Sequence, residues 1–211
     1  MSTVYLLRHG IRLDVDDPVY SPHYLKRPDD VPLSARGIAQ ARETAEFLRG
    51  RSIEAIYASP FFRALQTAQP IAETLDLPIR VENGFMEMLR PETFAGYPEV
   101  LPADERAKVF PRVDPAYQSF SCASYPEPDF EADVVDRVNR ALQPVLKTSH
   151  GRTILIVGHG ASVEAVGHLL RPGSLDAFEK KMCALNKYSL RRGGWVHEYG
   201  TIEHLSGETV S

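Results

Sequence analysis

The sequence predicts an α/β protein with a mostly parallel central sheet. Apolar runs of strand length alternate along the chain with segments of helical periodicity, the pattern of successive strand–helix units. Two of these runs, residues 4–7 and 153–157, are each followed closely by a histidine and a glycine, at His9 and His159. Parallel strands end on one edge of a sheet, where open α/β proteins bind ligands. We therefore expect the two imidazoles to lie around one point.

Size and composition place further limits on the protein. The 211 residues suit a single domain spanning 1–211, with 43% hydrophobic and 25% charged residues. The net charge of −4 argues against a partner that is a nucleic acid or a membrane surface. The run at 4–7 is too short for a signal peptide or a membrane span. Cys122 and Cys183 lack the spacing of a zinc site, so we expect reduced thiols in a cytoplasmic protein.

The chain begins with the strand at 4–7, which an irregular stretch with four prolines follows over 11–33. Ser34 is a suitable N-cap for the first helix, and Gly50 favours its termination. Between them, apolar residues recur at helical spacing at Ile38, Ala41, Ala45 and Leu48.

A second strand is expected over 53–58, and a third over 79–82. Between them a helix is expected to start with Ser59 as its N-cap and Pro60 as its first residue. The buried face of this helix is predicted to consist of Leu65, Ala68, Ile71, Ala72 and Leu75.

The regular alternation breaks over 88–128, which holds seven of the sixteen prolines and six aromatic residues. An irregular insertion of this length is typical of a lid over a binding site or of an arm that covers an apolar patch. A helix is expected next over 129–149, kinked or ended early by Pro144. The last expected elements are a strand over 153–157, a helix over 161–170 and a hairpin of strands 187–192 and 195–203.

His9 is the first candidate for chemistry. A neutral imidazole can attack through one ring nitrogen while a hydrogen bond holds the other. Gly10 beside it would let the backbone approach a ligand. The alternative is a structural histidine at a strand end, but Arg8 and the second strand–His–Gly segment favour the chemical interpretation.

Two further arginines indicate an anion. Arg63 falls in the first turn of its predicted helix, where a cation is unfavourable unless an anion binds there too. Arg12 lies four residues beyond Arg8, and arginine's planar fork matches the oxygens of a phosphate. The Arg63 side chain could instead extend into solvent or pair with a nearby carboxylate.

Four motifs together resemble the histidine phosphatase superfamily, which includes the cofactor-dependent phosphoglycerate mutases. They are residues 7–10 (Leu-Arg-His-Gly), 32–41, 59–68 and 158–160 (Gly-His-Gly), and the resemblance covers nearly the whole chain. It implies a phosphoglycerate mutase-like fold, a three-layer α/β/α sandwich. It also implies that His9 becomes phosphorylated, while Arg8, Arg63 and His159 bind the phosphate.

The family also uses a carboxylic acid that protonates the leaving group. The segment of residues 85–87 (Phe-Met-Glu), just after the third strand, makes Glu87 the proton donor by this resemblance. Glu82 on the strand and Glu92 after a proline are rivals within five residues. A surface carboxylate is the alternative interpretation of Glu87.

The residues after the first motif depart from most of the family. Positions that usually carry an acid or amide, a Ser or Thr, and an Asn are here Ile11, Arg12 and Val15. No counterpart of the mutases' substrate-binding segment is found over 88–100. The sequence looks closer to the branch of the suppressor-of-T-cell-receptor-signalling phosphatases and ecdysteroid-phosphate phosphatase. In that branch an arginine at the Arg12 position joins the phosphate pocket.

The expected function is that of a phosphomonoesterase that needs no metal or cofactor and acts through a phosphohistidine. Its substrate would be a small or aromatic phosphate monoester, including phosphotyrosine, because aromatic residues in the insertions at about 11–33 and 88–128 are expected to rim the active site. His23 in the first insertion could face the pocket. The alternatives are a phosphoglycerate-type mutase, a catalytically silent phosphate-binding module and a histidine-ligated metalloenzyme. An exposed edge at the C-terminal hairpin leaves room for a homodimer.

Overall fold

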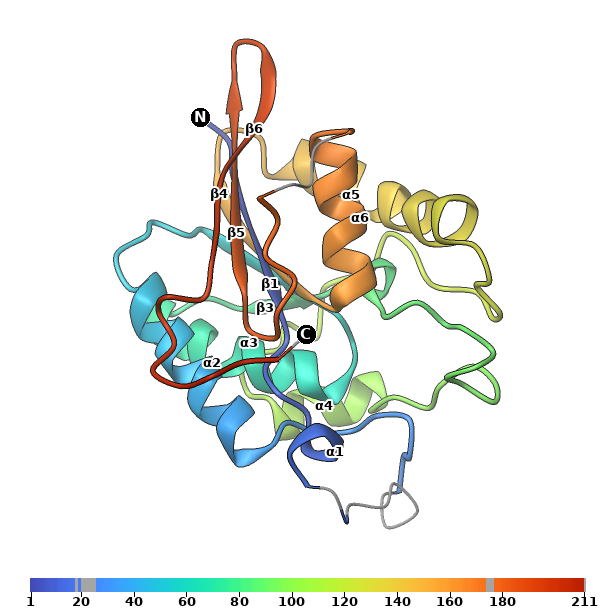
Figure 1. Cartoon of the computed structure of the whole chain (residues 1–211). Coiled ribbons are helices and arrows are strands. Elements are labelled where there is room, and N and C mark those ends of the chain that lie inside the picture. Colours follow the sequence, from blue (N-terminus) through green and yellow to red (C-terminus); the bar gives the residue numbers. More distant parts are fainter. Residues whose placement is uncertain (18, 20–25, 174–176, 211) are drawn as a thin grey trace.

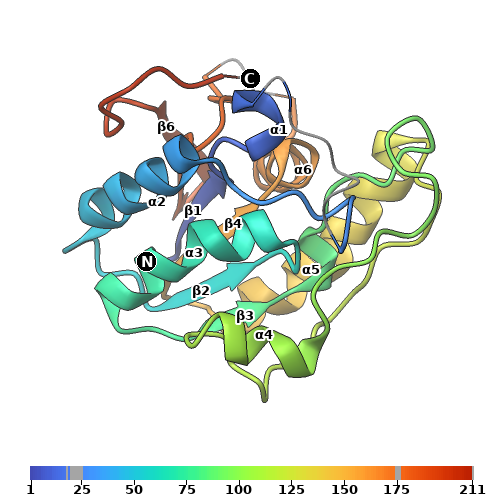
Figure 2. The same ribbon diagram turned by 90° about the horizontal axis from the view of Figure 1, so that it is seen from below.

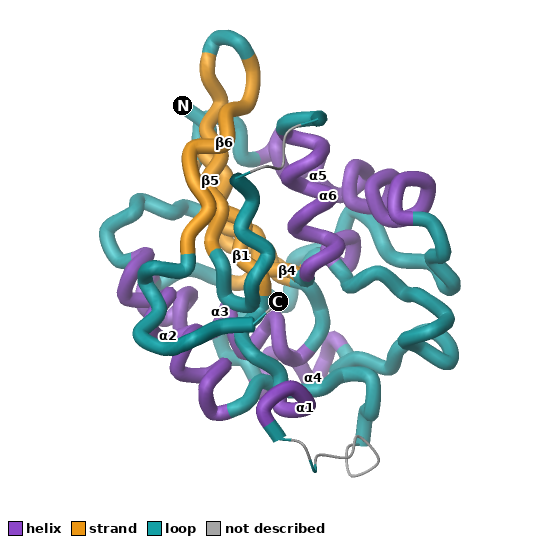
Figure 3. The backbone as a smooth tube through the Cα atoms, in the orientation of Figure 1, coloured by secondary structure: helices purple, strands orange, loops and turns teal. Residues whose placement is uncertain are grey.

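Six strands form one sheet in the order β3-β2-β4-β1-β5-β6 (Figure 1). The structure, a computed structural model, describes residues 1–17, 19, 26–173 and 177–210. The strands are β1 (Thr3–Arg8), β2 (Ala55–Ala58), β3 (Ile79–Val81), β4 (Thr153–Gly158), β5 (Leu185–Arg191) and β6 (Gly194–Thr201). The first four strands run parallel, whereas β5 and β6 are antiparallel and form the predicted hairpin. This hairpin extends beyond the rest of the sheet (Figure 3).

Helices cover both faces of the sheet, which confirms the expected three-layer α/β fold (Figure 2). The helices are α1 (Leu13–Asp16), α2 (Ala35–Leu48), α3 (Phe62–Leu75), α4 (Ala103–Val109), α5 (Asp136–Thr148) and α6 (Gly160–Leu170). A 3-10 turn (Asn83–Phe85) follows β3, and a π-helical turn (Phe130–Val135) leads into α5. Along β1, Tyr5 and Leu7 pack with α2 and α3, while Val4 and Leu6 pack with α5 and α6. This alternation is the period of two that a strand buried on both faces imposes.

The start of α3 differs from the prediction. The helix begins at Phe62, with Phe61 rather than Ser59 as N-cap, so Pro60 lies outside it. Phe61 has no capping side chain, and the carboxylate of Asp30 accepts a hydrogen bond from the Phe62 backbone N–H instead, at 2.6 Å. A residue of the first insertion therefore caps this helix. By contrast, Ser34 caps α2 as expected, by accepting from Gly37 N.

Two helices differ in detail from their sequence patterns. Ile38, one of the four apolar residues at helical spacing in α2, is exposed. Pro144 lies inside α5, which continues to Thr148, so the helix does not end early. An internal proline costs about 3 kcal/mol. Val138, Leu142 and Val145 are fully buried on the same helix, and burial of each such side chain contributes roughly 1.5–3 kcal/mol. Their packing outweighs the cost of the proline.

The stretch 88–128 is irregular apart from α4, a helix that the sequence analysis did not predict. Part of it extends the sheet: Ile79 of β3 forms backbone hydrogen bonds with Arg112 and Asp114, beside a bridge to Val113. This segment covers the β3 edge, which would otherwise present unpaired backbone groups.

Within the ranges the structure describes, none of the helices combines the length and apolar character needed to cross a membrane.

Candidate active site

A pocket of about 540 Å³ lies where the parallel strands end. It is lined by Arg12, Asp14, Pro28, Asp29, Val31, Arg63, Glu87, Met88, Arg90, Thr93, Phe94 and Ala161. Residues from both predicted insertions thus line it, together with three candidate site residues. His23 lies outside the described residues.

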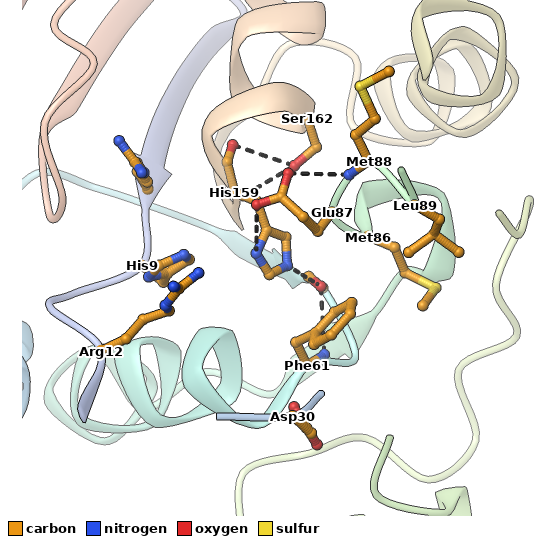
Figure 4. Close-up of polar contacts among 12 residues, drawn as sticks. His9, Arg12, Asp30, Phe61, Met86, Glu87, Met88, Leu89, His159 and Ser162 are labelled. Atoms are coloured by element: carbon orange, nitrogen blue, oxygen red, sulfur yellow. Dashed lines mark hydrogen bonds and ion pairs between the residues drawn. The ribbon is translucent and has the colours of Figure 1, made fainter. Parts of the chain in front are cut away.

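His9 follows β1 directly and is almost completely buried, with 1% of its surface exposed (Figure 4). Its Nδ1 lies 2.8 Å from the carbonyl oxygen of Gly10. A carbonyl only accepts hydrogen bonds, so Nδ1 carries the proton and the lone pair is on Nε2. Burial, and secondly the charge of Arg63, lower the pKa of His9 well below its ordinary value. His9 is therefore a neutral imidazole with a nucleophilic Nε2 at pH 7.

Gly10 packs closely against the start of α2. A Cβ on Gly10 would lie 2.7 Å from the carbonyl oxygen of Gly37, and one on Gly37 would collide with Ile11. The two glycines let the His9 loop pack directly against the start of α2. Side chains of Thr67 and Gln40 accept hydrogen bonds from Gly10 N and Ile11 N, both at 3.1 Å. The motifs at 32–41 and 59–68 thus hold the backbone that follows the nucleophile.

His159 comes to lie beside His9, as the strand pattern predicts. Their ring centroids are 5.2 Å apart, and His159 is fully buried. It caps α6, with its backbone N–H donating to Ser162 Oγ, and its Nε2 is 2.7 Å from Ser59 Oγ. Ser59 thus contacts the site instead of capping α3. Burial, followed by the charge of Arg63, lowers the pKa of His159 well below its ordinary value.

These two histidines make stability pH-dependent. Their pKa values are lower in the folded protein than in the unfolded chain, where they are about 6.5. The unfolded state therefore binds more protons below that pH, and stability is lost as the pH falls. From about pH 7.5 to 5.5 each histidine should contribute a loss of up to ~1.4 kcal/mol.

Urea unfolding at both pH values measures this effect. The variant His159→Gln should lose less stability on acidification than the wild type, whereas a change at the exposed His150 should leave the difference unchanged. An equal pH effect in wild type and His159→Gln would contradict the assignment.

Arg63 is the second residue of α3 and is buried, as an anion-binding role requires. Its guanidinium carbon lies 4.3 Å from the centre of the Phe61 ring. Burial lowers the pKa of Arg63 to about 10, so it remains a cation at neutral pH. Within the described part of the chain, the buried Nε of Arg63 has no hydrogen-bond partner. Such an orphaned charged donor is costly unless an anion accepts from it.

Arg8 and Arg12 differ in the hydrogen bonds that their guanidinium groups make. Arg8 donates to the Lys180 carbonyl, and its buried Nε has no partner among the residues described. The guanidinium lies beside Gly160, where an added Cβ would be in ordinary van der Waals contact with it at 3.6 Å. Arg12 lines the pocket but forms a bidentate pair with Asp14, at 2.9 and 2.8 Å. Asp14 therefore offsets part of the charge that Arg12 brings.

Glu87 is the carboxylate closest to the two imidazoles. Its Oε2 is 3.7 Å from His159 Nδ1, its Oε1 accepts from Met88 N at 3.0 Å, and 23% of its side chain is exposed. Of its rivals, Glu92 is exposed and does not line the pocket. Glu82 is fully buried and accepts hydrogen bonds from the backbone and hydroxyl groups of the 3-10 turn and residues 117–121.

Glu82 is expected to stabilise the folded protein through its hydrogen bonds. In Glu82→Gln, an amide NH₂ would face donors that now bind a carboxylate, leaving buried groups unpaired. The free energy of unfolding should fall by about 2–4 kcal/mol. Thermal unfolding measures this, and Glu92→Gln is the exposed control, expected to change stability by less than ~0.5 kcal/mol. A Glu82→Gln protein as stable as the control would contradict the structural role.

The donor atoms of His9, Glu87 and His159 lie within 4.8 Å of one another, a spacing that could hold a metal ion. The surroundings do not favour one. Arg8, Arg12 and Arg63 all act electrostatically on His9, so a metal ion bound there would be repelled by three positive charges. The same charges attract an anion.

Four residues at or behind the site were not identified from the sequence as part of it. Ser59 opens the motif at 59–68 but was given no role beyond that of a helix cap, and Asp30 was not singled out. Arg137 and Glu127 form a buried ion pair at 2.6 Å, directly behind the segment that carries Glu87. A signal was present for Arg137: it lies three residues after Val134 and four before Ala141, on the apolar face of its helix.

Fold and site together define an α/β protein in which a buried, neutral histidine lies among arginine side chains at the edge of a parallel sheet. The sequence model of the histidine phosphatase superfamily (branch 1) matches residues 4–201. The chain belongs to this superfamily, and the expected class, a phosphatase with a phosphoglycerate mutase-like fold, is confirmed.

Three proteins illustrate the relationship. The transcription factor tau 55 kDa subunit of Saccharomyces cerevisiae is 30% identical over 99% of this chain, which spans only 51% of that protein. The uncharacterized phosphatase PhoE of Bacillus subtilis is 30% identical, with 98% of each chain covered.

The ecdysteroid-phosphate phosphatase of Bombyx mori is 28% identical over 97% of this chain, which spans 35% of that enzyme. A crystal structure of the Bombyx enzyme with tungstate has a TM-score of 0.76, with 100% of this chain and 96% of that chain covered at 22% identity. The predicted resemblance to that branch is confirmed.

Proposed function

We propose that this protein hydrolyses phosphate monoesters through a phosphohistidine formed on Nε2 of His9. The observation that carries this proposal is the hydrogen bond from His9 Nδ1 to the Gly10 carbonyl, because it leaves the Nε2 lone pair available. Burial keeps that imidazole neutral, and cationic donors surround it.

In the first step, the Nε2 lone pair forms a bond to phosphorus while the bond to the ester oxygen breaks. The electron pair of that bond goes to the leaving oxygen, which takes a proton from the carboxylic acid of Glu87. Arg8, Arg12, Arg63 and His159 stabilise the equatorial oxygens. In the second step, water attacks the phosphohistidine and gives a proton to the Glu87 carboxylate. The P–N bond breaks, and its electron pair returns to His9.

His159 is proposed to become an imidazolium while the substrate is bound. In the free protein its pKa is low because of burial and Arg63. A phosphate monoester with a charge of roughly −1.5 to −2 would oppose both effects, since an adjacent anion favours the protonated ring.

The proposed substrate is a monoester with a small or aromatic leaving group, phosphotyrosine included. The pocket volume of about 540 Å³ accommodates a small molecule. Val31, Met88 and Phe94 give it an apolar wall, while Arg90 and Asp29 supply polar groups. The two insertions that carry these residues would then set the choice of leaving group.

A panel of phosphomonoesters tests this function. Wild-type protein should release inorganic phosphate, with the highest kcat/KM for aromatic esters, and should keep its activity with a chelator present. Isomerisation of a phosphoglycerate faster than phosphate release would establish a mutase instead. Loss of activity on chelation would establish metal-dependent chemistry, and binding of vanadate without turnover of any monoester would establish a silent module.

A further inference from the structure

Arg137 has unusual surroundings for a cation. It projects from α5 with 1% of its surface exposed, and its guanidinium binds the main chain that leads to Glu87. NH1 donates to the carbonyl oxygens of Gly84 and Met86, at 2.8 and 3.0 Å, and NH2 donates to that of Glu87, at 3.3 Å. One side chain thus fixes three of the four carbonyl groups from residue 84 to residue 87.

Glu127 completes this arrangement from the far end of the long insertion. Its two carboxylate oxygens accept from Nε and NH2 of Arg137, at 2.6 and 3.0 Å. The same carboxylate accepts from Leu89 N at 3.1 Å, and Glu127 N donates to the Leu89 carbonyl at 2.9 Å. Arg137 and Glu127 together therefore hold the backbone on both sides of Glu87.

Stability alone is a weak reason for such a pair. Removing two charges from water costs several kcal/mol, and well-packed apolar side chains often stabilise a protein as well or better. This pair instead supplies hydrogen bonds of fixed direction. The planar guanidinium donates to several carbonyl groups at once, which an apolar side chain could not do.

The side chain of Glu87 needs such support. It is partly exposed, and within the described residues its carboxylate has one hydrogen bond, to the neighbouring backbone N–H of Met88. Its position 3.7 Å from His159 Nδ1 thus depends on the backbone that carries it. Misplacing a catalytic group by about 1 Å can lower a rate by ~100-fold.

We propose that Arg137, oriented by Glu127, is a positioning residue that holds Glu87 where it can protonate the leaving oxygen. This inference rests on the proposed function, because it assigns Glu87 the role of proton donor. Arg137 acts only through the backbone of residues 84–87 and does not contact the substrate.

The dependence of the rate on the leaving group tests this role. A nitrophenolate departs readily without a proton, whereas an alkoxide needs one. The readout is kcat/KM, because it reports only the steps through departure of the leaving group, whereas kcat also contains the hydrolysis step in which Glu87 acts as base. In Arg137→Lys, whose single ammonium cannot span three carbonyls and a carboxylate, kcat/KM for an alkyl phosphate should fall by ~10- to 100-fold. The kcat/KM for p-nitrophenyl phosphate should change by less than ~3-fold, and Glu87→Gln should show the same selectivity more strongly.

Two further variants secure the test. The double variant Arg137→Met/Glu127→Met removes both buried charges and should fold even where Arg137→Lys does not, and it should show the same selective loss. Arg140→Lys, an exposed change on the same helix, should leave both substrates unaffected. Equal loss for both substrates, or no loss for either, in Arg137→Lys or in the double variant would overturn the inference.

Other results would contradict the proposed function itself. It fails when His9→Ala retains turnover of p-nitrophenyl phosphate, or when Glu87→Gln lowers kcat/KM equally for both substrates. A different result would overturn only the positioning role of Arg137. In that case turnover still requires His9 and Glu87→Gln is still selective for the alkyl phosphate, but the Arg137 variants show no selective loss.

Discussion

Replacing His9 with alanine is expected to lower kcat for phosphate release by at least ~10⁴-fold, since the reaction loses its nucleophile. The structure gives the reason. His9 is the buried imidazole whose Nδ1 is held by Gly10, and the lone pair on its Nε2 has no replacement when the ring is removed.

Phosphate release from p-nitrophenyl phosphate measures the effect of His9→Ala. The matched control is His150→Ala, an exposed histidine outside the pocket, which should retain wild-type kcat. A His9→Ala protein with more than about a tenth of wild-type activity and an intact fold would remove His9 from the mechanism.

Replacing Arg63 with methionine should give the second largest loss of activity. It should lower kcat/KM without lowering the stability of the fold. Two charge-assisted hydrogen bonds to the phosphate, each worth about 1.5–3 kcal/mol, correspond to a loss of roughly 10²- to 10⁴-fold in kcat/KM. The fold should not suffer. The variant loses a buried cation with an unpartnered Nε and keeps an apolar stem of similar length against Phe61.

Thermal unfolding and kcat/KM, measured on the same preparations, test this pair of effects. Arg63→Met should unfold at the wild-type temperature or above while losing activity, and Arg49→Met, an exposed control, should change neither. Arg63→Met with wild-type kcat/KM would show that Arg63 does not bind the phosphate. A large fall in unfolding temperature would show that its charge is compensated in the free protein.

The sequence was sufficient for the parts of the fold that depend on periodicity. The strands at 4–7 and 153–157 are neighbours in the sheet, and Arg8 lies opposite Gly158 in register, so His9 and His159 follow at the same edge. Because strand ends converge in a parallel sheet, the positions of these residues could be predicted without coordinates. Glu87 and Arg63 also lie at the site, as the motifs indicate.

Contacts between distant segments explain what the sequence could not predict. Ser59 and Pro60 have the local signature of a helix start, but Ser59 binds His159, and Asp30 caps the helix from 32 residues away. Arg137 lies on an apolar helix face because carbonyl groups some fifty residues earlier surround its guanidinium. None of these partners is visible in a local pattern.

Trapping the bond between phosphorus and His9 is the most direct test of the proposed mechanism. Wild-type protein mixed with p-nitrophenyl phosphate should be quenched under alkaline conditions within the first turnovers, digested and examined by mass spectrometry. The peptide containing His9 should carry one phosphoryl group, which mild acid removes, and the same peptide from His9→Ala should carry none. Wild-type turnover with no phosphoryl group on His9 at any quench time, or with the group on another residue, would contradict the account.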